Sequence, residues 1–293
     1  MKSMPLCIQP TIYSDGTYNQ TLLTTSVQYS TQTRNGTSVA EGISKAFMDS
    51  YNVLTNLSNI THVVEDETNT FLFMSNETTH EPSLLKEPEY VPMEHIDNTQ
   101  YDAEHTDRFV VDGTELNMSE PLQFIHYQTN MSAMMQLGKW LDYLRENEVY
   151  DNTKIIIVSD HGQPLSHLDE LVFGTETYKN AEFFYPLLMV KDFGSKEFSV
   201  SDEFMTNADV PTLAVKDLIE NPVNPFTEKE INNLEKTAHE QYIIISNKWD
   251  VMTNNGNAFL PAMWASVKES LWEKENWAFY ESDIVLEQHQ FPE

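Results

Sequence analysis

The feature that most constrains the fold is a helix pattern that leads into a short apolar strand pattern and a polar turn. Between Leu122 and Asn147 apolar residues recur at spacings of three and four, which predicts one long amphipathic helix. After a short connection come Lys154 and four consecutive β-branched residues, Ile155–Val158. Such a run predicts a strand buried on both faces, as in a parallel sheet. Helix, loop, buried strand and polar turn together predict an α/β fold.

The polar turn after this strand is Ser159-Asp160-His161-Gly162. Ligands of open α/β sheets bind outside the carboxyl ends of the strands, where this turn would lie. Carboxylate and imidazole groups bind divalent cations, and adjacent Asp and His residues at a strand end can both reach one ion. Gly162 is expected to allow a sharp bend. The alternative is that Asp160 caps a turn beside an ordinary histidine.

Shorter patterns outline the rest of the chain. The sequence predicts a helix within residues 41–58, a strand at 70–75, a small hairpin at 108–113, a strand at 183–190, a helix opening at 207–213 and a strand at 241–246. We expect residues 1–40 to be irregular and residues 41–230 to form one α/β domain. Residues 231–293 carry a strand and a Trp-rich segment, which we expect to pack on the same domain.

Composition narrows the class of protein. The chain has 293 residues, 40% of them hydrophobic, which is enough for one sizeable core. Its formal net charge is −29, and no basic face that would indicate a nucleic-acid binder is visible. The acidic residues are spread along the chain, which indicates a self-repelling surface or, in part, cation binding. Cys7 is the single cysteine, so an internal disulfide is excluded. No run approaches the roughly 20 apolar residues of a membrane helix, and the first residues do not resemble a signal peptide.

Residues 149–162, with the sequence VYDNTKIIIVSDHG, resemble the late metal-binding segment of sulfatases and lipoteichoic acid synthases. In this alkaline phosphatase/sulfatase superfamily an amphipathic helix leads to a YDNT turn, a hydrophobic strand and an SDHG or GDHG loop. Residues 71–82 resemble an earlier strand whose loop presents a substrate-facing histidine. Residues 204–213 resemble a later helix with the pattern D-x-x-P-T-L/I. The resemblance covers about residues 45–225.

The resemblance implies a three-layer α/β sandwich with a mainly parallel central sheet, incomplete at the N-terminus. It implies that Asp160 and His161 bind a divalent metal, which can be Mn, Zn, Mg or Ca. It also implies that His80 faces the ester oxygens or the leaving group, and His167 lies close enough in sequence to His161 to reach the same site. The alternatives are that His80 is a capped loop histidine and that His167 is a solvated loop residue.

The activity implied by the resemblance is metal-dependent hydrolysis or transfer of sulfate or phosphate esters, including phosphoglycerol transfer. The substrates implied are an envelope polymer or a lipid head group, at the extracytoplasmic face of the membrane. The family nucleophile is a Cys or Ser in a C/S-x-P-x-R context, or a Thr. Residues 7–11 depart from that context because they lack the Arg, and Thr24, Thr25 and Thr37 are candidates by residue type alone.

We therefore expect the C-terminal part of a larger membrane-anchored enzyme without a recognisable nucleophile. The alternative is a non-catalytic remnant, or a module that binds envelope polymer on the same scaffold. We expect no nucleic acid as a partner in either the enzyme or the binding module.

Overall fold

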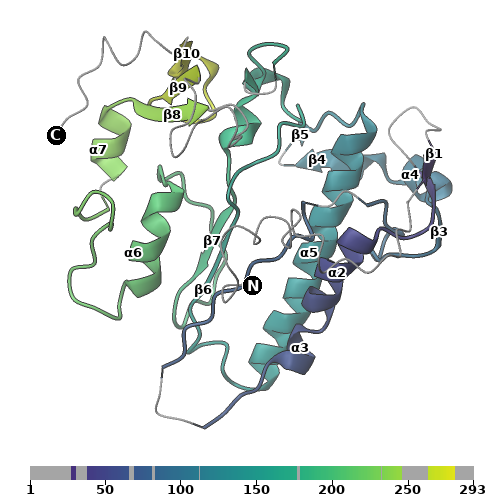
Figure 1. Cartoon of the computed structure of the whole chain (residues 1–293), viewed down its shortest axis with the longest axis horizontal. Helices are drawn as coiled ribbons and strands as arrows, with labels where there is room; N and C mark the ends of the chain where they lie inside the picture. The colour runs from purple at the N-terminus through teal and green to yellow at the C-terminus, as the bar shows by residue number, and fades with distance from the viewer. Residues whose placement is uncertain are drawn as a thin grey trace, which may run out of the picture. The chain divides into compact units, whose positions relative to one another are not determined.

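The computed structural model describes residues 28–30, 38–65, 69–80, 83–111, 113–176, 179–231, 233–245 and 263–280. The chain divides into two compact units, Met1–Asn147 and Glu148–Glu293, and each is described by itself (Figure 1). The division falls directly after the longest helix. The domain boundaries expected from the sequence, at residues 40 and 230, stay predictions.

The first unit is built on the long helix α5, Pro121–Glu146, which confirms the prediction for residues 122–147. Pro121 stands at its first turn, and the Gln123 side chain accepts a hydrogen bond from the Glu120 backbone N–H at 2.8 Å, so the helix start is capped. Helices α2, Lys45–Thr55, and α3, Leu57–Ile60, pack along α5 (Figure 1). They confirm the helix predicted within residues 41–58.

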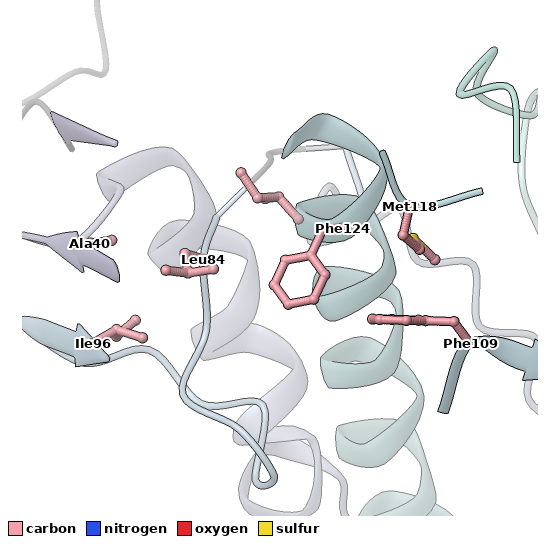
Figure 2. Packing of buried hydrophobic residues seen from close by; sticks show 7 residues of the cluster. Ala40, Leu84, Ile96, Phe109, Met118 and Phe124 are labelled. Atoms are coloured by element: carbon pink, nitrogen blue, oxygen red, sulfur yellow. The ribbon is translucent and has the colours of Figure 1, made fainter. Parts of the chain in front are cut away.

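A hydrophobic cluster fills the space beside the N-terminal half of α5 (Figure 2). Its buried members are Ala40, Leu84, Ile96, Phe109, Met118, Phe124 and Ile125. The buried face of α5 is partly polar: Gln128 accepts from the Leu85 N–H at 2.8 Å, and Ser132 donates to the Tyr90 carbonyl at 2.7 Å. The helix thus pairs backbone groups of the loop that lies on it, which a purely apolar stripe would leave unsatisfied.

Short antiparallel strands complete the first unit. Strands β1, Gln28–Ser30, β2, Val39–Glu41, and β3, His95–Asp97, form one sheet in that order. Residues 1–40 were expected to be irregular, and their described part instead contributes strand residues to this sheet. Strands β4, Val110–Val111, and β5, Thr114–Glu115, pair as a hairpin, which confirms the prediction there, with Asp112 outside the described residues. Helix α4, Thr99–Glu104, and the 3-10 turn η2, Thr106–Phe109, connect β3 to this hairpin.

The strand expected at residues 70–75 is wrong. The described residues there are irregular, and Phe71, Leu72 and Phe73 are 81%, 74% and 81% exposed. A strand is stabilised by its ladder to a neighbour, and none of the described strands pairs with this segment. Local β-propensity alone therefore does not produce a strand here.

In the second unit β6, Ile155–Val158, pairs with β7, Leu188–Lys191, in antiparallel register, Ile155 opposite Lys191 and Val158 opposite Leu188 (Figure 1). Ile155, Ile156 and Ile157 are half-buried and Val158 is exposed, so β6 is not buried on both faces. The described residues show helices and small antiparallel sheets, and they do not confirm the parallel central sheet. The strand predicted at 183–190 begins only at Leu188, after the 3-10 turn η5, Ala181–Phe184, and Pro186, which has no backbone N–H for a ladder.

Another antiparallel sheet is formed by β8, Gln241–Ile245, β9, Met263–Val267, and β10, Trp277–Tyr280. Its strand order is β10-β9-β8, so β9 lies in the middle. β8 confirms the strand predicted at 241–246. Trp277 is buried in a cluster with Leu171, Ala181, Phe204 and Val267, whereas Trp272 is exposed and Trp249 lies outside the described residues.

The remaining elements of the second unit are short. They are η3, Asp169–Leu171; η6, Asn207–Asp209; α6, Val210–Val215; α7, Asn233–Ala238; and η7, Lys274–Asn276. Over the described residues, no helix combines the length and the hydropathy needed to cross a membrane.

Candidate metal centre

The Ser159–Gly162 turn leaves β6 and is hydrogen-bonded to the residue that precedes β7. The Ser159 N–H donates to the Leu187 carbonyl at 3.1 Å, and the Leu187 N–H donates to Ser159 Oγ at 2.7 Å. Gly162 N–H then donates to the Phe183 carbonyl at 3.0 Å. Both ends of the turn are therefore fixed by the backbone that runs into β7.

Within the turn, hydrogen bonds orient the two predicted ligands. The His161 N–H donates to Asp160 Oδ1 at 2.9 Å, which leaves Oδ2 available. His161 Nδ1 lies 2.6 Å from the Gly162 carbonyl oxygen. A carbonyl oxygen only accepts, so Nδ1 carries a proton, and Nε2 is the ring nitrogen that would bind a metal. Nε2 lies 3.6 Å from Asp160 Oδ2, and the Asp160 side chain is 88% exposed.

This pair has the chemistry and spacing of two ligands of one divalent cation. Ligand atoms about 2.1 Å from a tetrahedral ion are about 3.4 Å apart, close to the separation of Oδ2 and Nε2. A carbonyl that accepts from the other ring nitrogen is the usual support of a metal-binding histidine. Over the described residues no group of three or more His, Cys, Asp or Glu side chains could hold a metal ion. Asp160 and His161 therefore fit two positions of a metal site, and the described residues do not supply a third.

A glycine is needed at position 162 because there is no room for a side chain there. A Cβ atom at this position would lie 2.0 Å from the Glu182 carbonyl oxygen and 2.8 Å from that of Tyr185. Its φ angle is not in the left-handed region, where Gly42, Gly113 and Gly194 lie. The sequence prediction of a glycine-dependent turn thus holds for a different reason: two backbone carbonyls approach too closely for any side chain.

The loop that carries His167 is held by side chains of the neighbouring 180–182 segment. The Glu182 carboxylate accepts from the Leu165 and Leu168 N–H groups at 3.1 and 2.8 Å, and Asn180 Nδ2 donates to Ser166 Oγ at 3.1 Å. His167 itself is half-buried in this hydrogen-bonded loop. A catalytic role for His167 stays a prediction.

His80 belongs to the first unit, in the turn formed by residues 78–80, where its N–H donates to the Glu77 carbonyl at 3.1 Å. Its side chain is exposed. Because the two units are described separately, its assignment to the same site as Asp160 stays a prediction. The nucleophile candidates Thr24, Thr25 and Thr37, together with residues 7–11, lie outside the described residues.

Comparison with known families adds the decisive observation, because a model of the sulfatase family matches residues 12–215. The chain belongs to the sulfatase family. This places it in the alkaline phosphatase/sulfatase superfamily, which implies an α/β fold, whereas the resemblance to lipoteichoic acid synthases in particular is not confirmed. No curated protein and no solved structure shows a significant match.

In this sulfatase-family chain the matched region includes His80, Asp160, His161 and His167, and it ends at the last residue of α6. The sequence patterns indicated no role for Asn207 beyond its place at the start of the helix opening predicted at 207–213. Thr206 takes the capping position instead, and the Asn207 amide donates to the Ser159 and Asp160 carbonyls, at 3.0 Å each. No local pattern could reveal a contact between residues 47 positions apart.

Asp209, in the motif that the sulfatase resemblance singled out, is 1% exposed. It accepts from Lys236 Nζ at 2.5 Å and from Asn224 Nδ2 at 3.2 Å. Burial pushes the pKa of Asp209 up, but the hydrogen bonds from Lys236 and the Thr206 N–H outweigh burial and lower that pKa. Asp209 is therefore ionised, and its carboxylate holds Lys236, Asn224 and the Thr206 backbone in place.

Proposed function

We propose that this sulfatase-family chain acts in the metal-dependent cleavage of sulfate esters, with Asp160 and His161 as two of the metal ligands. The observation that carries the proposal is the turn geometry. The Gly162 carbonyl fixes the His161 tautomer, and Nε2 and Asp160 Oδ2 lie at a separation that suits one cation.

When bound, a divalent metal would polarise the oxygens of a sulfate or phosphate ester. Asp160 supplies negative charge to the metal position, and His161 supplies a neutral nitrogen ligand whose ring is oriented by its hydrogen bond to Gly162. His80 stabilises charge on the ester or protonates the leaving group. His167 is the second candidate for proton transfer.

The proposal extends to phosphate esters, because sulfate and phosphate esters both present tetrahedral anionic groups. In its transferase form the substrate is a phosphoglycerol donor and the acceptor an envelope polymer or lipid head group, at the extracytoplasmic face of the membrane. The loop at His80, and the departure of residues 7–11 from the C/S-x-P-x-R context of sulfatases, support this form.

The first test is calorimetric titration of the chain with Mn²⁺, Zn²⁺, Mg²⁺ and Ca²⁺. Asp160→Ala should abolish binding of the preferred metal, and His161→Ala should weaken it at least tenfold. The control is Asp202→Ala, which removes another exposed carboxylate from the same unit. Equal binding by the wild-type chain and by Asp160→Ala would contradict the metal assignment.

One observation favours a second candidate function. The described residues supply two candidate metal ligands and no third, so a remnant that binds without turnover is the second candidate. We infer for this case a module that binds envelope polymer on the same scaffold. Release of nitrophenol from an aryl sulfate or a phosphodiester by the metal-loaded wild-type chain, lost in Asp160→Ala, would exclude this candidate.

A further inference from the structure

The side-chain amide of Asn207 is hydrogen-bonded to two residues of the candidate metal turn, Ser159 and Asp160. Its Nδ2 group donates to the Ser159 carbonyl and to the Asp160 carbonyl, at 3.0 Å each. A primary amide has two N–H donors, so both are used. The turn is thus held from the β7 side by Leu187 and, through its carbonyl groups, by Asn207.

The position of Asn207 is itself fixed by a buried network. Thr206 donates from its N–H and its Oγ1 to Asp209 Oδ2, at 2.9 and 3.2 Å, which closes the short turn that contains Asn207. Asp209 is buried and is paired with Lys236, whose Nζ also donates to the Phe204 carbonyl at 3.3 Å. Lys236 lies beyond residue 215, where the family match ends.

We propose that Asn207 is a positioning residue, which holds the Ser159–Asp160 turn so that Asp160 Oδ2 stays beside His161 Nε2. Lys236 supports this role through Asp209. The inference rests on the proposed metal-binding function, because the position of Oδ2 matters to function only if that oxygen binds a cation.

The effect of a substitution at Asn207 depends on what replaces its two N–H donors. In Asn207→Asp the shape is kept, but a carboxylate oxygen takes the place of Nδ2 and faces two carbonyl oxygens, so two attractions become repulsions. Asn207 is exposed, so the substitution leaves the hydrophobic clusters unchanged and the protein should fold. The control is Asn152→Asp, which makes the same chemical change at another exposed position of the same unit.

The experiment measures amide hydrogen exchange by mass spectrometry on the metal-free chain, and metal affinity by calorimetry. In Asn207→Asp we expect faster exchange in peptides that cover residues 159–162, and a metal Kd weaker by about 10- to 100-fold. Asn152→Asp should match the wild-type chain in both measurements. Lys236→Met should shift both in the same direction as Asn207→Asp, because it loosens Asp209.

The outcomes separate this inference from the proposed function. Unchanged exchange at residues 159–162 in Asn207→Asp would overturn the positioning role, whatever the metal affinity. Faster exchange in Asn207→Asp, together with no metal binding by the wild-type chain, would support the hold on the turn and refute the metal function.

Discussion

At the scale of single residues, the space around the candidate metal turn is set by backbone atoms. The carbonyl oxygens of Glu182 and Tyr185 occupy the volume into which a side chain at position 162 would project. Backbone atoms cannot turn aside as the end of a flexible side chain can. Any residue larger than glycine must therefore displace the turn, the 182–185 segment, or both.

Gly162→Ala is expected to lower the free energy of unfolding by about 3 kcal/mol, at the upper end of the range for overpacking. Chemical denaturation of the purified chain measures this change. The control is Gly138→Ala in α5, where an added Cβ has nothing within 4 Å, and where helix propensity predicts a gain of about 0.5–1 kcal/mol. Similar effects of the two substitutions would contradict the close approach at Gly162.

Glu87 is a buried carboxyl group of the first unit, with a side chain 0% exposed. Two nitrogens of Arg108 lie 3.2 Å from its two oxygens, while Asp102 shares the same guanidinium group at 2.6 Å. Burial raises the pKa of Glu87 to about 7, against the opposing effect of Arg108. The folded chain therefore holds this proton more tightly than the unfolded chain does.

A raised carboxyl pKa means that ionisation of Glu87 opposes folding. Its contribution to the free energy of unfolding is expected to fall as the pH rises from about 4.5 to about 7, and to level off above this window. Denaturation curves of the wild-type chain and of Glu87→Gln should thus show a stability difference that shifts in favour of the variant across that range. Glu94→Gln, at an exposed position, is the control. A difference that does not change between pH 5 and 8 would contradict the raised pKa.

The candidate ligands could be predicted from the sequence, but their supports could not. Asp160 and His161 are neighbours in a motif, so their pairing requires only a turn. Gly162 was predicted for its conformational freedom and is needed for space, because the carbonyls that crowd it come from residues 20 or more positions away. Asn207 was missed for the same reason, since its partners are brought to it by the fold.

At the scale of elements, the long periodic pattern was predicted well, whereas short apolar runs were predicted with mixed success. α5 has 26 residues, and its ends lie within one residue of the prediction. Ile155–Val158 is a strand as predicted, but its partner is the antiparallel β7, because a run of apolar residues does not specify a neighbour. Residues 70–75 form no strand, although their composition is similarly apolar.

Substitution of an aromatic residue in the segment 70–75 tests whether this segment is exposed or forms a buried strand. Phe73→Ala is expected to change the free energy of unfolding by less than about 0.5 kcal/mol, because this side chain is already in contact with solvent. Phe47→Ala in α2, where the side chain is 0% exposed, should cost about 3–5 kcal/mol. Urea denaturation compares the two variants. A cost near that of Phe47→Ala would show that residues 70–75 form a buried strand.

At the scale of the whole molecule, the chain consists of two units with separate clusters of buried residues. In the first unit α2 and α3 pack on α5, and the hydrophobic clusters there are formed by residues of that unit alone. Buried contacts within a unit are what allow it to fold by itself. We therefore expect the first unit to fold independently.

Residues 1–147, expressed alone, are expected to show a helical circular dichroism signal and cooperative thermal unfolding. The control is the same fragment with Phe47→Ala, which should unfold at a clearly lower temperature because a buried ring is lost. A fragment without helical signal, or with a gradual melt, would show that the first unit depends on residues 148–293.

The ion pair between Asp209 and Lys236 bears on how the chain can be shortened. A chain truncated to the family-matched part would end at residue 215 and would lack Lys236. The Asp209 carboxylate, 1% exposed, would then lose its cationic partner, and an unpaired buried charge costs several kcal/mol. The boundary drawn by sequence similarity is thus not a safe place to cut, and a shortened chain must retain α7.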